Sequence, residues 1–242
     1  MEMTEQSIKV IVDELAHSGT SWTHNKFFDD NGYMYLKDFV DPQILYHPLP
    51  DLRGQLNYRS NDLNDFKHFE LEQQVEGSLA RYWHPQYRKT HSDIRISLEK
   101  IIGRKLYNTY YYDRFYFPGQ KLEKHTDRAA CEISVSIHIS SNIKEQWPIY
   151  IKTPDVYETK SKSAKQKTFS KIEKKGDIVG VLLNPGDAVL YKGCERPHWR
   201  DPMPGSFEMM REDAEQLYFH QIFFHYVLQD GIRAHYAWDK CN

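Results

Sequence analysis

The stretch Pro118–Ser136 reads PGQKLEKHTDRAACEISVS, and it is the part of the chain that predicts the fold. A Pro-Gly turn precedes a short segment in which one residue separates His125 from Asp127. On a β-strand, residues i and i+2 point to the same face, so this imidazole and this carboxylate would converge. Alternating apolar residues then run from Cys131 to Ile139, which is typical of a further strand. The pattern predicts two neighbouring metal ligands within a β-rich region.

The hydrophobic period becomes two at Leu106 and stays so for most of the remaining chain. Pro-Gly pairs separate several of these alternating segments, as expected of turns between strands. The predicted strands are Leu106–Phe117, Cys131–Ile139, Trp147–Lys152, Ile178–Leu183, Ala188–Tyr191 and Leu217–Leu228. This arrangement favours a barrel or sandwich with helices packed on one side.

The first hundred residues are predicted to be mostly helical. Apolar residues recur at three- and four-residue spacing in Ser7–His17. A second helical pattern covers Val75–Ile102, interrupted near His84-Pro85 and ended by Gly103. Between them, a short strand is expected at Tyr33–Leu36 after an Asn-Gly turn, and Asp41-Pro42 has the sequence of a helix start.

Composition narrows the class of protein. The chain has 242 residues, enough for one sizeable core, and its 32 Lys and Arg nearly balance its 34 Asp and Glu. The near-neutral net charge argues against a nucleic-acid-binding protein. The sequence contains no run of 18 or more apolar residues, so we expect no membrane span. The first ten residues lack the apolar core of a signal peptide, and three cysteines cannot build a disulfide framework. We therefore expect a cytoplasmic protein.

A third metal ligand is predicted at His198. It lies in the segment NPGDAVLYKGCERPHWR, residues 184–200, after a short apolar strand and a glycine-containing bend. Two histidines and one carboxylate form the facial triad of non-haem Fe(II) oxygenases, which leaves three coordination positions open. A zinc site would want four ligands, often thiolates, whereas Cys131 and Cys194 are isolated.

These motifs resemble those of a known family. Residues 119–127, GQKLEKHTD, are similar to the GQxYxxHxD element of prolyl-4-hydroxylase-like 2-oxoglutarate/Fe(II)-dependent dioxygenases, and residues 184–200 resemble the segment that carries their second histidine. The resemblance covers about Leu106 to Val227. It implies a mainly β fold with flanking helices and a double-stranded β-helix core (a jelly roll, cupin-like). By this resemblance, His125, Asp127 and His198 bind Fe(II).

The resemblance also implies an organisation and a reaction. One domain, 1–242, would comprise a mostly helical flanking region, 1–103, and the β-helix core, 104–240, with a Lys-rich insertion at 159–175. The family uses dioxygen and 2-oxoglutarate to hydroxylate an unactivated C–H bond, releasing succinate and CO2, and ascorbate is a candidate additional cofactor. The substrate would be an amino acid, a peptidyl residue such as proline, or another small metabolite. Two alternatives stay open: an Fe(II) oxidase that does not use 2-oxoglutarate, and an inactive jelly-roll binding module.

The far carboxylate of 2-oxoglutarate needs a buried cation or hydroxyl groups. The family often places a tyrosine nine residues before the first ligand histidine, and Tyr116 holds that position. Arg114 alternates with Tyr116 on the same predicted strand face. Both are therefore candidate 2-oxoglutarate contacts.

The family's basic residue about ten positions after the second histidine is missing, because position 208 is Glu. The remaining candidates are Arg200, Arg211 and Gln221. Arg200 is favoured, since on a continuing strand it would share the face of His198.

For several other polar residues and segments, two alternative roles stay open. Arg128 would hold a substrate carboxylate or pair on the surface with Glu132 or Glu123. Ser134 and Ser136, on one face of the same predicted strand, would contact a bound ligand or be ordinary strand hydroxyls. The segment Thr159–Lys175 contains seven lysines and is predicted to be a solvated loop or mobile insertion, with a lid or a contact to an acidic partner as the alternative.

Overall fold

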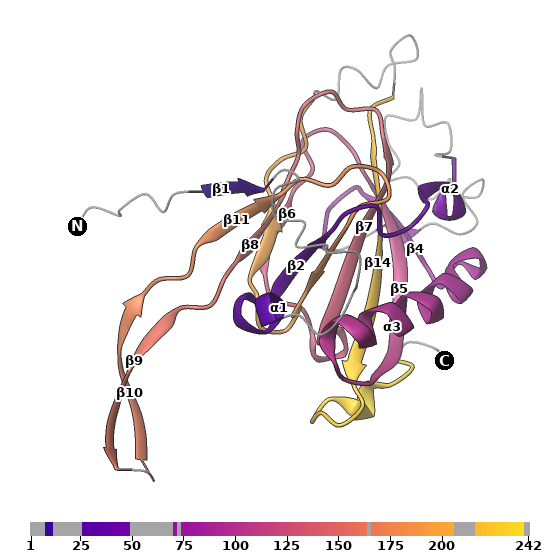
Figure 1. Ribbon diagram of the computed structural model, residues 1–242. Coiled ribbons are helices and arrows are strands. Elements are labelled where there is room, and N and C mark those ends of the chain that lie inside the picture. The colour runs from indigo at the N-terminus through magenta and orange to yellow at the C-terminus, as the bar shows by residue number, and fades with distance from the viewer. Residues whose placement is uncertain are drawn as a thin grey trace.

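In the described part of the chain, the backbone forms two large, mainly antiparallel β-sheets and a separate two-stranded sheet (Figure 1). The computed structural model describes residues 8–11, 26–48, 70–71, 74–163, 166–205 and 216–239. The larger sheet has seven strands in the order β2-β12-β7-β14-β5-β4-β3. In that order they are Tyr33–Leu36, Ala188–Tyr191, Ile133–Ser141, Phe219–Leu228, Leu106–Tyr116, Leu79–Tyr82 and Glu70–Leu71.

The smaller sheet carries five strands in the order β1-β11-β8-β13-β6. In that order they are Ile8–Ile11, Ile178–Val181, Ile149–Lys152, His198–Arg200 and Leu122–His125. Strand β1 runs parallel to β11, and the other described pairs in this sheet are antiparallel. The strand pairing brings β6 and β13, which are far apart in sequence, side by side.

The two sheets pack face to face through buried side chains. Tyr35 and Val189 of the larger sheet share one hydrophobic cluster with Ile151 and Val179 of the smaller sheet. The opposite face of the larger sheet is covered by helix α3, Arg88–Ile102, whose buried side chains pack against β7 and β14. This is the jelly-roll core with flanking helices that the sequence predicted.

The short helices follow their sequence signals. Helix α1, Lys26–Asn31, ends before Gly32, whose φ of 73° few other residues tolerate. Helix α2, Pro42–Leu45, is capped by the carboxylate of Asp41, as predicted. Helix α3 ends at Gly103 in the left-handed conformation, again as predicted. Single 3₁₀ turns, η2, η3 and η5, occur at Pro85–Tyr87, Ala129–Cys131 and Ala234–Tyr236.

Two helix predictions in the first hundred residues are wrong over part of their length, whereas the predicted helix that ends at Ile102 is confirmed by α3. Ile8–Ile11, within the predicted helix Ser7–His17, is a strand on the edge of the smaller sheet. Leu79–Tyr82, within the predicted helix Val75–Ile102, is strand β4, paired with β5. In both places an open strand edge satisfies the backbone groups, and this pairing overrides local helix propensity.

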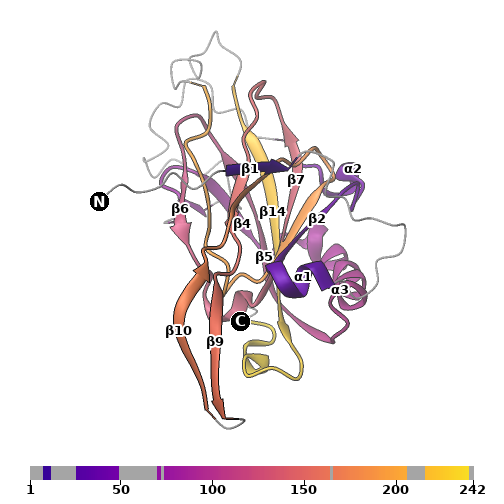
Figure 2. The same ribbon diagram turned by 60° about the vertical axis from the view of Figure 1, so that its left-hand side comes forward.

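The Lys-rich insertion is a β-hairpin and not a loop. Strands β9, Val156–Ser163, and β10, Gln166–Lys174, pair with each other in a separate two-stranded sheet. The hairpin extends away from the two main sheets in both views (Figures 1 and 2). At its base, the Gly176 amide donates to Asp155 Oδ1 at 2.8 Å. Within the part of the chain that the structure describes, no helix is both long and apolar enough to cross a bilayer.

Candidate metal centre

His125 and His198 face each other across two paired strands. His125 ends β6, His198 begins β13, and the two residues are direct partners in the antiparallel register. Their ring centroids are 4.4 Å apart. Asp127 follows β6, and its Oδ1 lies 3.5 Å from Nε2 of His125 and 3.4 Å from Nε2 of His198. One candidate ligand atom from each residue lies within 4.8 Å of the others, so the structure brings the predicted trio together.

Backbone carbonyls set the orientation of both imidazoles. Nδ1 of His125 lies 2.7 Å from the carbonyl oxygen of Glu123, and Nδ1 of His198 lies 2.9 Å from that of Arg196. Because a carbonyl only accepts, each Nδ1 carries the proton and donates it. Each Nε2 faces Asp127 and is the ring nitrogen left to bind a metal, an arrangement typical of metal-bound histidines.

Asp127 remains ionised in this environment. Its burial alone would raise the pKa of the carboxyl, but hydrogen bonding to His125 and His198 outweighs burial and holds the pKa well below its usual range. Two neutral imidazole nitrogens and one carboxylate oxygen on one side of a site match the donors of non-haem Fe(II) oxygenases. The three side chains therefore fit that metal chemically.

Arg200 is the buried cation closest in sequence to this trio. It lies on β13, two residues after His198, and is only 2% exposed. Its guanidinium donates to the Trp147 carbonyl at 2.6 Å and to Gln221 Oε1 at 3.1 Å, while its Nε is buried without a hydrogen-bond partner. The carbon Cζ lies 4.4 Å from the Trp147 ring centroid and 4.8 Å from that of Phe219.

No carboxylate in the described ranges pairs with Arg200, and burial lowers its pKa to about 10. A buried cation is costly unless an anion compensates it. The Arg200 site is therefore suited to a ligand carboxylate. Gln221, on β14, adds an amide whose Nε2 is buried and without a hydrogen-bond partner.

Tyr116 and Arg114 form a second polar pair on β5. The buried Tyr116 hydroxyl accepts from Nη1 of Arg114 at 2.9 Å. Nη2 of Arg114 donates to Oε1 of Gln74 at 3.0 Å, and Nε2 of Gln74 lies 2.8 Å from Nε2 of His125. Gln74 therefore links Arg114 to the metal-facing side of His125. Sequence reasoning missed Gln74, because no motif marks the turn in which it lies.

Arg128 and Arg211 are the remaining arginines with a predicted role. Arg128 pairs with Asp239 near the C-terminus, and not with Glu132 or Glu123 as the surface alternative predicted. Arg211 and Glu208 lie outside the described residues.

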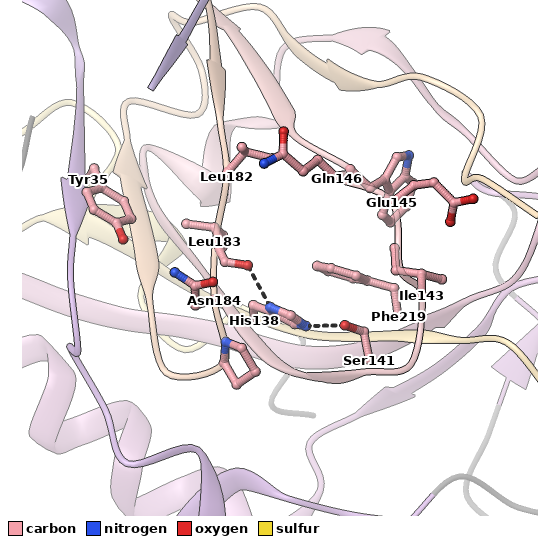
Figure 3. Close-up of a pocket in the computed structure, with 12 residues that line it drawn as sticks. Tyr35, His138, Ser141, Ile143, Glu145, Gln146, Leu182, Leu183, Asn184 and Phe219 are labelled. Atoms are coloured by element: carbon pink, nitrogen blue, oxygen red, sulfur yellow. Dashed lines mark hydrogen bonds between the residues drawn. The ribbon is translucent and has the colours of Figure 1, made fainter. Parts of the chain in front are cut away.

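A cavity of about 240 Å³ is bordered by the two rings that contact Arg200 (Figure 3). Trp147 and Phe219 line it together with His138, which stacks on Phe219 at 4.1 Å between ring centroids. His138 contacts the Leu183 carbonyl through Nδ1 and Ser141 Oγ through Nε2, as drawn in Figure 3. Burial lowers the pKa of His138 to about 4. This histidine is thus part of the packing.

Comparisons with known proteins identify the fold. No family model matches the sequence, and no curated protein matches it. Among solved structures, the non-heme alpha-ketoglutarate-dependent carbocyclase SnoK of nogalamycin biosynthesis has a TM-score of 0.52 at 11% identity, over 89% of this chain and 88% of that chain. The epimerase SnoN of the same biosynthesis has a TM-score of 0.51 at 10% identity, over 82% and 80%.

EctD from S. alaskensis, solved with 2-oxoglutarate and 5-hydroxyectoine, has a TM-score of 0.50 at 13% identity, over 93% of this chain and 84% of that chain. The chain therefore has the jelly-roll fold of 2-oxoglutarate/Fe(II)-dependent oxygenases, which confirms the resemblance seen in the sequence at the level of the fold.

Proposed function

We propose that the protein is a 2-oxoglutarate- and Fe(II)-dependent dioxygenase that hydroxylates an unactivated C–H bond of an amino-acid, peptidyl or small-metabolite substrate. The observation that supports this most strongly is the convergence of His125, Asp127 and His198 on the fold of such oxygenases. Fold alone does not define a reaction, so the proposal depends on this donor set and on the buried cation beside it.

The three ligands would hold Fe(II) on one side and leave the other side open. When bound, Fe(II) and 2-oxoglutarate supply the oxidising chemistry: dioxygen is consumed, the substrate gains a hydroxyl group, and succinate and CO2 are released. The Nδ1 hydrogen bonds of both histidines would hold each Nε2 in place to bind the ion. Ionised Asp127 supplies the single negative charge, so the loaded site keeps a net positive charge that attracts an anionic chelator.

Arg200 would neutralise the far carboxylate of 2-oxoglutarate. The cation is buried, lacks a carboxylate partner in the described chain and has an unsatisfied Nε. The amide of Gln221 would complete this contact. Tyr116 would donate its hydroxyl proton to the co-substrate, because it already accepts from Arg114. The surrounding aromatic side chains exclude water from the charge pair, which strengthens it.

Two measurements test the proposal. Under anaerobic conditions, Fe(II) and 2-oxoglutarate added together should produce a weak visible charge-transfer band. Succinate release should then depend on substrate when amino acids, peptides and metabolites are screened. An inactive binding module would give no band. An oxidase independent of 2-oxoglutarate would consume oxygen equally with and without it, and the buried Arg200 favours the 2-oxoglutarate-dependent reaction over this alternative.

A further inference from the structure

The two carboxylate oxygens of Asp127 face different partners. Oδ1 faces the Nε2 atoms of both histidines at 3.5 and 3.4 Å. Oδ2 accepts a hydrogen bond from Oγ of Ser134 at 2.9 Å. Ser134 is fully buried near the start of β7, on a different strand from either histidine. Oδ1 therefore faces the candidate metal site, whereas Oδ2 is hydrogen-bonded to a strand of the larger sheet.

His225 orients the Ser134 hydroxyl. Nδ1 of His225 lies 2.9 Å from Ser134 Oγ, and the two residues are direct partners in the β14–β7 register. A hydroxyl has one proton, and an ionised carboxylate is the strongest acceptor near this one. The consistent assignment has His225 Nδ1–H donating to Ser134 Oγ, and Ser134 donating to Asp127 Oδ2. The Tyr110 ring, with its centroid 4.6 Å from that of His225, packs against the imidazole.

The backbone at Gly193 lies against the Oδ2 side of the Asp127 carboxylate. The Asp127 amide donates to the Gly193 carbonyl at 2.9 Å. A Cβ atom at position 193 would lie 2.3 Å from Asp127 Oδ2 and 2.8 Å from Ser134 Oγ, so the chain approaches this closely only because residue 193 is glycine. Backbone and hydroxyl together leave little room for the carboxylate to rotate.

We propose that Ser134, oriented by His225, is a positioning residue that keeps Asp127 a monodentate ligand. This inference rests on the proposed metal site. A carboxylate that bound through both oxygens would occupy one of the three positions left for the two donor atoms of 2-oxoglutarate and for dioxygen. By engaging Oδ2, Ser134 reserves that position. The hydroxyl thus sets the number of open coordination positions without touching the metal.

The test compares Ser134→Ala with Ser136→Ala in the full-length protein. Ser136 lies two residues further along β7, equally buried, and its Oγ contacts Tyr191 at 3.4 Å and not Asp127. Anaerobic calorimetry with Co(II) measures metal affinity, and the Co(II) absorption spectrum reports coordination number. We expect Ser134→Ala to weaken Co(II) binding about 10- to 100-fold and to change the spectrum, as the loss of a hydrogen bond to a metal ligand does. Ser136→Ala should stay within about twofold of wild type.

A second variant tests the same contact in case Ser134→Ala does not fold. His225→Phe keeps a ring against Tyr110 but removes the donor to Ser134, and it should weaken Co(II) binding about tenfold. Thermal melts of the metal-free variants identify any that are unfolded. A wild-type spectrum and affinity in both folded variants would overturn the inference. If the wild-type protein binds neither Co(II) nor Fe(II), the proposed function fails instead, so the two failures are distinguishable.

Discussion

His198 and Arg200 lie on the same buried face of β13, with the half-buried Trp199 between them stacked on Tyr150. One three-residue strand therefore presents both a candidate metal ligand and the buried cation suited to a carboxylate. The family's basic residue about ten positions after the second histidine is missing here, and Arg200 was the favoured substitute in the sequence. Two residues of extended backbone therefore set the separation between the candidate ligand His198 and the cation of Arg200.

Replacing Asp127 with Asn should abolish metal-dependent activity. The substitution preserves size and removes the only negative charge among the three ligands. We expect metal affinity to fall about 100-fold or more, with no succinate release above background. Calorimetry with Fe(II) under anaerobic conditions and a succinate assay measure the two effects. Asp155→Asn, at the base of the hairpin, is the matched control. Wild-type metal affinity in Asp127→Asn would remove this residue from the site.

Replacing Arg200 with Gln should raise the KM for 2-oxoglutarate and leave metal affinity unchanged. A charge-assisted contact contributes about 1.5–3 kcal/mol, which corresponds to about 10- to 150-fold in KM. Steady-state kinetics at varied 2-oxoglutarate measure the change. Arg104→Gln removes an exposed guanidinium that pairs with Asp230 and should have no effect. An unchanged KM in Arg200→Gln would assign the carboxylate contact to another residue.

Tyr116→Phe should have a smaller effect than the Arg200 substitution. It removes one hydroxyl, which would cost about 1 kcal/mol and raise the KM for 2-oxoglutarate about fivefold. The hydroxyl also accepts from Arg114, so a modest drop in melting temperature is expected as well. The exposed Tyr107→Phe serves as the control for ring substitutions on β5. Equal kinetics in both variants would argue that Tyr116 only packs.

Buried neutral histidines should make the fold acid-sensitive. Burial lowers the pKa of His91 to about 3, whereas an unfolded histidine titrates near 6.5. Below pH 6.5 the unfolded state binds a proton that the folded state does not, so stability decreases as pH falls from about 6.5 toward 3.

His91→Phe should reduce this acid sensitivity. The new ring would pack among Tyr111, Phe224 and Tyr226. Urea denaturation at pH 7 and pH 5 should show a loss of unfolding free energy that is about 2 kcal/mol smaller in His91→Phe than in wild type. The same loss in both proteins would mean that His91 does not carry this pH dependence.

Shortening the β9–β10 hairpin should leave the metal site intact. Its strands pair only with each other in the described structure, and Val156 and Lys174 are opposite one another at its base. Replacing residues 157–174 with two glycines should therefore change unfolding free energy by no more than about 0.5 kcal/mol. Metal affinity should equal that of the full chain. A large loss of either would show that the hairpin supports the core.

Residue spacing and the resemblance to a known family together predicted His125, Asp127 and His198 as candidate metal ligands, and the structure brings these three side chains together. His125 and Asp127 are one residue apart in a strand context, and His198 follows a turn and an apolar strand; the β-rich half after Leu106 was equally visible in its period of two. These are local properties, because side-chain direction along a strand alternates whatever the strand packs against. The structure confirms the predicted strands with small changes at their ends.

Contacts between distant segments had to come from the tertiary structure. Ile8–Ile11 and Leu79–Tyr82 have helical spacing but become strands, because open sheet edges pair with their backbones. The Ser134 contact to Asp127 and the absence of a described carboxylate beside Arg200 depend on which strands become neighbours. The sequence by itself determined which chemical groups are present and which face of a strand each occupies. Only the fold decided their partners, because hydrogen bonds and burial depend on distances that the linear order of residues does not specify.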